Sequence, residues 1–288
     1  MSTTPLRRIG HPIRTRSERV DRWITQAEQR REMAGDPIVI LSLGKTGTTS
    51  LERALKRATG RRVAKGHVAS RAGLDARIAK EARLGLVTRP HFWWRNEAIA
   101  TALRGPAPSG RWDVLTGVRD PVALAVSDRF YGRRLQTEAG LAVDRAENDE
   151  HGAAIESTLA RLFLDDDWFR SEFEPATGID VYAEPHPVGS AAVRERDRCR
   201  ALILRFEDLT TVAPAACQDF FGLDGPLVVE HGNRGDGDRD GSDYSRFLAA
   251  PVLDPAVVDA VYDTPLARHF YDDAERAAMR DRWIGVRR

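Results

Sequence analysis

Apolar residues in this chain fall into short continuous runs, each followed by a turn and then by apolar positions three or four residues apart. Runs of this kind occupy residues 38–43, 114–118 and 199–206. A short run bounded by turn signals is typical of a strand buried on both faces, and the wider spacing is typical of a helix. We therefore predict an α/β fold with three layers, α/β/α, in which helices cover both faces of a central, mainly parallel sheet.

Weaker patterns predict the remaining elements. Residues 61–66 and 178–182 are weakly strand-like, and residues 232–242 have the glycine-rich composition of a loop. Apolar positions at helical spacing predict helices over residues 51–59, 74–83, 91–103, 121–130, 153–173 and 212–221, and short helices over residues 254–283. We expect residues 36–288 to form one domain with a helical C-terminal portion.

Charge is distributed unevenly along the chain. The 288 residues have a net charge of +1, which does not favour nucleic acid as a partner. Residues 1–35 contain many arginines and few apolar residues. We expect them to form a basic arm that ends in a helix over residues 17–33, and the arm is a candidate for peripheral contact with an acidic or membrane surface.

The apolar content and the cysteines predict the compartment. No stretch reaches the roughly 20 apolar residues of a membrane span, and the N-terminal residues lack the apolar segment of a signal peptide. Cys199 and Cys217 make neither a disulfide framework nor a zinc site, so we expect two buried thiols. These features predict a cytoplasmic protein whose oligomeric state the sequence leaves open.

The turn after the first apolar run has the composition of an anion-binding loop. Residues 44–50, GKTGTTS, lie between a predicted strand and a predicted helix. The first N–H groups of a helix lack intrahelical partners, and the helix dipole adds partial positive charge at that end. Lys45 adds a full charge. We therefore predict phosphate binding by Lys45, Thr46, Gly47, Thr48, Thr49 and Ser50.

A nucleotide kinase or NTPase is one alternative for this loop. The P-loop of those proteins has the pattern G-x-x-x-x-G-K-[ST], which needs glycine at the position of Val39. The chain also lacks an obvious acidic residue at the end of an apolar strand to hold Mg²⁺. Hydrolysis of ATP is therefore disfavoured.

A second cationic position follows another predicted strand. Arg119 comes directly after the run at residues 114–118, and Pro121 suits the first turn of the next helix, which contains Ser127. Ligands of open α/β sheets bind beyond the carboxyl ends of the strands, where Arg119 is expected. Arginine grips phosphate through a planar two-pronged contact. The alternative for Arg119 is an ion pair with Asp120 or Glu207.

These motifs together resemble the sulfotransferases that use 3′-phosphoadenylyl sulfate (PAPS). Residues 44–50 are similar to the loop that binds the 5′-phosphosulfate in that family. Arg119 and Ser127, eight residues apart, are similar to its 3′-phosphate site, and residues 204–209, LRFEDL, are similar to its late strand. Residues 178–182 and 268–271 also resemble segments of bacterial sulfotransferase-like proteins associated with capsular polysaccharide synthesis.

The resemblance implies a P-loop type fold, PAPS as donor, PAP as product and no metal. It implies that Lys45 stabilises the leaving phosphate. His67 is the candidate base, because a histidine near this place acts as base in many family members and the usual pKa of histidine suits the task. His91 is the second candidate for the base, and Glu97 and Glu184 are alternatives, because some family members use a glutamate base. Trp93 and Trp94 are candidates for stacking on a sugar or on adenine, and Arg234, in the glycine-rich loop, is a candidate contact to the nucleotide.

The sequence leaves the acceptor open among a hydroxyl-bearing glycan, lipid or small metabolite. It also leaves a non-catalytic module that binds PAP or a glycan as an alternative to an enzyme.

Overall fold

The structure, a computed structural model, describes residues 23–24, 27–28, 30–83, 85, 90–141, 146–230 and 243–284, without the side chains of residues 90–93. Its centre is a five-stranded sheet in the order β2-β1-β3-β5-β4. Every pairing is parallel except that of β4 with β5. The strands are β1 (Ile38–Leu41), β2 (Val63–Gly66), β3 (Trp112–Val118), β4 (Ala192–Arg196) and β5 (Cys199–Arg205). An α/β fold with a mainly parallel sheet is thus confirmed.

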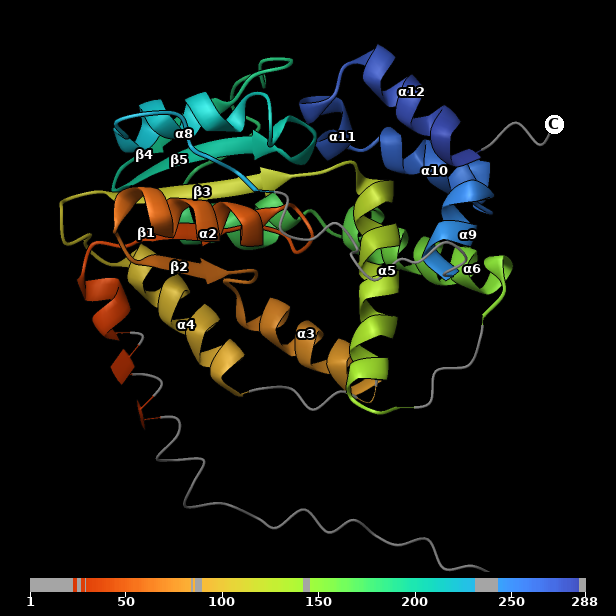
Figure 1. Cartoon of the computed structure of the whole chain (residues 1–288), viewed down its shortest axis with the longest axis horizontal. Helices are drawn as coiled ribbons and strands as arrows, with labels where there is room; N and C mark the ends of the chain where they lie inside the picture. Colours follow the sequence, from red (N-terminus) through yellow and green to blue (C-terminus); the bar gives the residue numbers. More distant parts are fainter. Residues whose placement is uncertain are drawn as a thin grey trace, which may run out of the picture.

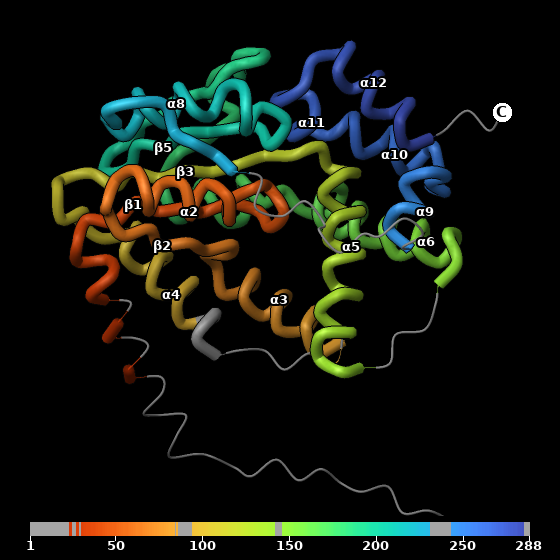
Figure 2. The backbone as a smooth tube through the Cα atoms, in the orientation of Figure 1, coloured from red at the N-terminus to blue at the C-terminus, as the bar shows by residue number. Residues whose placement is uncertain are grey.

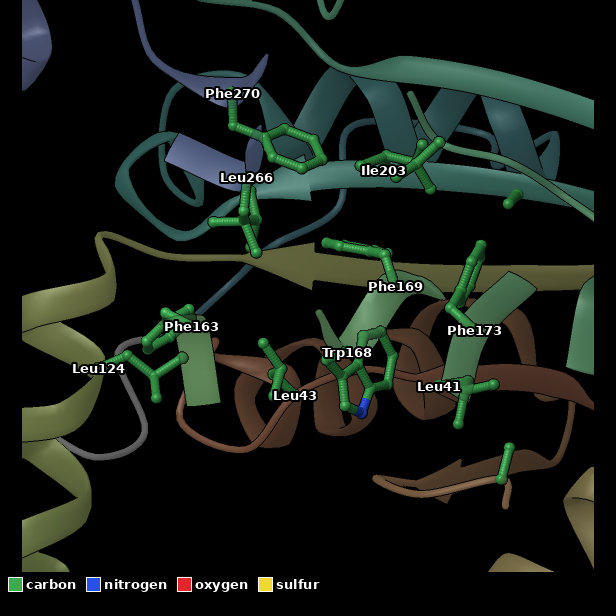
Figure 3. Close-up of a cluster of buried hydrophobic side chains, with 14 of the residues drawn as sticks. Leu41, Leu43, Leu124, Phe163, Trp168, Phe169, Phe173, Ile203, Leu266 and Phe270 are labelled. Carbon is green, nitrogen blue, oxygen red and sulfur yellow. The ribbon is translucent and has the colours of Figure 1, made fainter. Parts of the chain in front are cut away.

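Helices pack on both faces of the sheet because its central strands are apolar on both faces. Ile38 and Ile40 of β1 point to one side and pack with residues of α2 (Thr48–Thr59) and α8 (Ala213–Phe221). Their neighbours on the strand point to the other side and join a larger cluster of buried aromatic and aliphatic residues. Figure 3 shows part of this cluster, including Leu41, Trp168, Phe169 and Ile203.

The carboxyl ends of the parallel strands face α5 and the C-terminal helices, as Figure 1 shows. Figure 2 traces the same path of the chain as a tube. Among the helices that follow β2, β3 and β5 are α3 (Arg71–Arg83), α4 (Pro90–Arg104), α5 (Pro121–Glu138), α9 (Asp243–Ala249), α10 (Pro255–Tyr262), α11 (Pro265–Phe270) and α12 (Asp273–Ile284). The predicted helices at residues 51–59, 74–83, 91–103, 121–130, 212–221 and 254–283 are therefore confirmed, with α2 beginning three residues earlier and α5 two turns longer than expected.

The long helix predicted over residues 153–173 is wrong. The structure has α6 (Asn148–Leu159), two π-helical turns, η1 (Ala160–Leu164) and η2 (Phe169–Phe173), and α7 (Glu174–Thr177). The interruption follows from three consecutive aspartates after η1. Asp167 Oδ1 accepts a hydrogen bond from the N–H of Phe169 at 3.0 Å, so it acts as a cap that starts a new helical segment.

The strand predicted over residues 178–182 is also wrong. Gly178, with φ of 76°, ends α7, and Asp180 Oδ1 accepts a hydrogen bond from the N–H of Tyr182 at 2.9 Å. The aspartate thus closes a turn, and the apolar residues Ile179 and Val181 are buried against the core without strand pairing. The sequence analysis did not predict β4, because the charged side chains of this edge strand interrupt the apolar pattern of a strand.

Candidate functional site

The loop after β1 is built as a tight turn that ends at the start of α2. Lys45, with φ of 70°, and Gly47, with φ of 75°, both adopt the left-handed conformation. The hydroxyl of Thr46 donates to the carbonyl of Leu43 at 2.9 Å and lies 2.7 Å from the hydroxyl of Ser42. These contacts fix the turn, and Gly47 is the N-cap of α2. The free N–H groups of the first helical turn therefore lie at the carboxyl end of β1.

The predicted hydroxyl donors of the loop occupy different environments. Thr46 and Thr48 are buried, and Thr46 packs against Gly117 of β3. The hydroxyl of Thr49 accepts a hydrogen bond from Lys65 Nζ at 3.1 Å and keeps its own proton to donate. Ser50 is partly buried in the first turn of α2. Thr46 thus contributes to a ligand site through its backbone, while its side chain holds the turn together.

Lys45 is held away from solvent by an aromatic ring. Its Nζ lies 3.0 Å from the centroid of the Tyr131 ring on α5, a cation–π contact. The pKa of the lysine is lowered to about 7, chiefly by burial; the charge of Asp128 opposes this change, and the charges of Arg134, Lys80 and Arg119 add to it. A buried ammonium among other cations is stabilised by an arriving anion, so Lys45 is suited to hold one.

Arg119 joins the loop from the end of β3. Its Nη1 donates to the carbonyl of Lys45 at 3.0 Å, and its guanidinium carbon lies 4.1 Å from the centroid of the Phe206 ring. The Nε atom is buried and has no hydrogen-bond partner among the residues that the structure describes. A buried guanidinium N–H without a partner is costly, and an anionic ligand would satisfy it.

The alternative partners of Arg119 are occupied elsewhere. Asp120 is buried, and its carboxylate accepts hydrogen bonds from the hydroxyl of Tyr262 at 2.8 Å and from Trp283 Nε1 at 3.0 Å. Glu207 Oε1 accepts from the N–H of Asp120 at 2.9 Å, and Glu207 Oε2 from the hydroxyl of Tyr271 at 3.0 Å. Both carboxylates therefore brace the backbone around Arg119 and form no ion pair with its guanidinium among the described residues.

Arg119 also lines a cavity of about 270 Å³ at this edge of the sheet. Phe206, Tyr244, Met279 and Arg282 are among the other residues around it. A larger hollow of about 420 Å³ between α10 and α12 contains none of the predicted site residues. We therefore regard the cavity at Arg119 as the one connected with the loop.

Ser127 lies on α5 and is partly buried. Tyr131, which contacts Lys45, is four residues further along the same helix. Residues four apart share a face of a helix, so Ser127 is on the side of α5 that faces the loop. The structure thus gathers the loop, Arg119 and Ser127 at one edge.

His67 follows β2 at the same edge. Its Nδ1 lies 2.8 Å from the carbonyl oxygen of Ser42, which can only accept, so in the neutral ring Nδ1 carries the proton and Nε2 the lone pair. Burial lowers the pKa of His67 to about 4, and the charges of Lys65, Arg77 and Lys45 act in the same direction. The ring is therefore neutral near pH 7, the state that a general base requires.

The segment from His67 to Ser70 is held by residues that the sequence analysis missed. Asn96 Oδ1 accepts from the N–H of His67 at 2.7 Å, and Trp168 Nε1 donates to its carbonyl at 2.9 Å. The buried carboxylate of Glu172 accepts from the N–H of Ser70 at 2.6 Å. The signal in the sequence was a polar residue on the apolar side of a helical pattern, seen at Asn96 and Glu172.

The remaining candidates contribute less to this edge. Glu97 and Glu184 are exposed, and Glu184 pairs with Arg194 at 3.3 Å. Trp94 is partly buried in α4. The side chains of His91 and Trp93, and the whole of Arg234, lie outside the described residues.

The third motif completes the contact between loop and sheet. Phe206 and Leu209 lie in and after the short 3-10 turn η3 (Phe206–Asp208), and their side chains are nearest to the position that a Cβ at Gly47 would take. Arg205 is buried and pairs with Asp208 at 2.6 Å and with Glu275 at 2.8 Å. The three motifs, far apart in the sequence, therefore meet at the carboxyl ends of β1, β3 and β5.

In comparisons with known proteins, no family model, no curated protein and no solved structure matches this chain. Within the described residues, no helix is both long and apolar enough to cross a membrane, and no cluster of three potential metal ligands occurs. Cys199 and Cys217 are free and buried, as predicted.

Proposed function

We propose that this protein is a sulfotransferase that moves a sulfuryl group from PAPS to a hydroxyl of a glycan, lipid or small molecule. The proposal includes a P-loop type, three-layer α/β/α domain and a role in the bacterial cytoplasm, for example in capsular polysaccharide synthesis. The observation that carries it is the contact of Lys45 with Arg119 beside the start of α2; the buried Nε of Arg119 has no hydrogen-bond partner within the described part of the chain.

The site offers two places, some distance apart, for the two anionic groups of the donor molecule. The first turn of α2, together with Lys45, Thr49 and Ser50, offers N–H, ammonium and hydroxyl donors for a 5′-phosphosulfate. Arg119 and Ser127 offer donors for a 3′-phosphate, and the cavity beside Arg119 has room for part of the ligand. No metal is needed in this scheme, because cations of the protein compensate the charge.

The residues divide the work of transfer between them, and PAPS supplies the sulfuryl group. His67 accepts the proton of the acceptor hydroxyl at Nε2, and the hydroxyl oxygen bonds to sulfur as the bond from sulfur to the 5′-phosphate oxygen breaks. Lys45 stabilises the electron pair that stays on this phosphate oxygen. The net reaction converts the alcohol and PAPS into a sulfate ester, PAP and one proton.

Ligand binding tests the first half of the proposal. PAP should raise the melting temperature in the absence of Mg²⁺, and Arg119→Ala should abolish this shift. Arg111→Ala is the matched control, because Arg111 is exposed and pairs with Glu195 at the far end of β3. Stabilisation by ATP with Mg²⁺ but not by PAP would instead support a nucleotide kinase or NTPase.

Turnover tests the second half. Radiolabelled PAPS and a panel of hydroxyl acceptors should give a labelled product with the wild-type chain. Lys45→Ala and His67→Ala should lower the rate of transfer at least about a hundredfold, a typical effect of losing an electrostatic or acid–base group. A chain that binds PAP but labels no acceptor would be a non-catalytic binding module.

A further inference from the structure

The C-terminal helix α12 forms one wall of the cavity beside Arg119. Met279, Arg282 and Trp283 of this helix line the cavity of about 270 Å³, and Arg119 and Phe206 line it from just beyond the ends of β3 and β5. Figure 1 shows α12 beyond the carboxyl ends of these strands, beside α10 and α11. A ligand in the cavity would therefore touch the edge of the sheet and α12 at the same time.

Contacts near both of its ends hold α12 against the edge of the sheet. Glu275, in the first turn, pairs with the buried Arg205 at 2.8 Å. Trp283, in the last turn, is itself buried and donates from Nε1 to the carboxylate of Asp120 at 3.0 Å. Arg282 and Trp283 follow Glu275 by seven and eight residues, so the three share one face of the helix. This fixed face therefore holds the backbone of Arg282 beside the cavity.

The cavity offers hydrogen-bond donors, while its carboxylates are engaged with protein groups. Its charged lining residues are Arg119, Arg282, Asp120 and Glu207. Each oxygen of the two carboxylates accepts a hydrogen bond from a backbone N–H, a tyrosine hydroxyl or the indole of Trp283. Within the described residues, by contrast, the buried Nε of Arg119 has no partner and Arg282 forms neither an ion pair nor a side-chain hydrogen bond. The unsatisfied groups are thus cationic donors, which suit an anion.

The size and the other lining residues of the cavity indicate which part of a ligand it holds. Its volume of about 270 Å³ is slightly below the range of about 300–1,000 Å³ that is usual for pockets enclosing a whole small ligand, so it takes one end of a larger molecule. Phe206 and Tyr244 add aromatic surface for the sugar or base next to an anionic group. Arg119 Nη1 donates to the carbonyl of Lys45 at 3.0 Å, so the cavity adjoins the loop. The cavity therefore suits one phosphate of a ligand whose other anionic group lies at the loop.

We propose that Arg282 binds the 3′-phosphate of the donor from the side of α12, while Arg119 contacts it from the end of β3, and that Arg282 thereby selects nucleotides with this phosphate. The inference rests on the proposed sulfotransferase function and deepens it, because it assigns the choice of donor to a residue outside the three motifs. Two guanidinium groups can engage the oxygens of one phosphate through planar, two-pronged contacts. A nucleotide without a 3′-phosphate leaves Arg282 without a partner and binds through its 5′ end alone.

The test compares PAP with adenosine 5′-phosphate (AMP), which lacks the 3′-phosphate, by calorimetry on the full-length chain. Arg282→Ala should weaken PAP binding about tenfold, the scale of losing one hydrogen bond to a charged group, and should change AMP binding by less than about twofold. Arg282→Lys should recover part of the affinity for PAP, because it restores the charge without the planar contact. The control is Arg280→Ala, which removes another exposed arginine of α12 that pairs with Asp259 and does not line the cavity; it should bind both nucleotides as the wild type does.

Equal weakening of PAP and AMP in Arg282→Ala would overturn the inference, because a purely structural role of α12 affects both nucleotides alike. Unchanged PAP binding in Arg282→Ala, or the same loss in Arg280→Ala, would overturn it as well. The transfer assay with labelled PAPS separates this inference from the proposed function. A chain that binds PAP through Arg282 but sulfates no acceptor contradicts the proposed enzyme alone, whereas active transfer with PAP binding that is independent of Arg282 contradicts this inference alone.

Discussion

Replacing Gly47 with alanine tests how closely the loop is pressed against the end of β5. A Cβ at Gly47 would lie 2.2 Å from Leu209 Cδ1 and 3.0 Å from Phe206 Cδ2, and the residue has φ of 75°. The substitution therefore combines a strained backbone with a steric conflict. Gly60, at the other end of α2, has φ of 62°, but no atom lies within 4 Å of its Cβ position. Gly60→Ala is thus a matched control for the backbone alone.

The structure sets the expected magnitudes. An L-residue in the left-handed region costs about 1–2 kcal/mol, which is the whole effect expected for Gly60→Ala. Displacing packed side chains adds about 1–3 kcal/mol, so Gly47→Ala should lose about 2–5 kcal/mol in total. The difference between the two variants, about 1–3 kcal/mol, measures the contact between the loop and the residues after β5.

Equilibrium unfolding in guanidinium chloride, followed by tryptophan fluorescence, gives the loss of unfolding free energy for each variant, provided that the two transitions have equal slopes. Equal destabilisation by the two substitutions would refute the reasoning, because it would mean that Leu209 yields without cost and the loop is not held there. If the loop does depend on this contact, Gly47→Ala should also weaken PAP binding, while Gly60→Ala should leave it unchanged.

Three further predictions concern buried groups. Asp120→Ala should destabilise the protein by about 3–6 kcal/mol in the same unfolding assay, because it removes the N-cap of α5 and leaves two buried hydrogen-bond donors unpaired. The control, Asp259→Asn, changes an exposed ion pair and should alter the free energy of unfolding little. PAP binding near pH 8 should be accompanied by uptake of close to one proton, because Lys45, with a pKa of about 7, is then mostly neutral and a bound anion favours its charged form. Calorimetry in buffers of different ionisation enthalpy measures this uptake. The absence of proton uptake by the wild type, or the same uptake by Lys45→Met, would contradict the prediction. Burial raises the pKa of Cys199 to about 11 and that of Cys217 to about 12, so a thiol reagent at pH 8 should label neither until the protein unfolds, and rapid labelling of the native chain would show that these thiols are accessible.

The sheet and the loop could be predicted because their signals are local. A continuous apolar run followed by glycine and hydroxyl residues predicts a strand and a helix start without knowledge of the rest of the chain, as at β1 and α2. Predictions failed where a short polar side chain decides the backbone. Asp167 starts a new helical segment inside an apolar pattern, and Asp180 closes a turn within residues that otherwise suit a strand.

The candidate site was predictable only in part, for a related reason. Lys45 and Arg119 stand at strand ends that the sequence marks, and parallel strands bring such ends to one edge. Glu172 is 102 residues from Ser70, and Tyr131 lies on a helix whose register against the loop no local pattern fixes. Such partners depend on how elements pack, so a single sequence contains no spacing rule that would reveal them.

The contacts of the third motif change what its resemblance to sulfotransferases can support. Glu207 bonds the backbone of Asp120 and the hydroxyl of Tyr271, and Asp208 pairs with the buried Arg205. Both acidic residues therefore stabilise the edge of the sheet and the backbone around Arg119. These hydrogen bonds and ion pairs do not point either carboxylate toward a ligand. Similarity in this segment supports a similar edge, whereas similarity of ligand depends on Lys45 and Arg119. Substitutions at these two cations are for that reason the decisive test of PAPS as the donor.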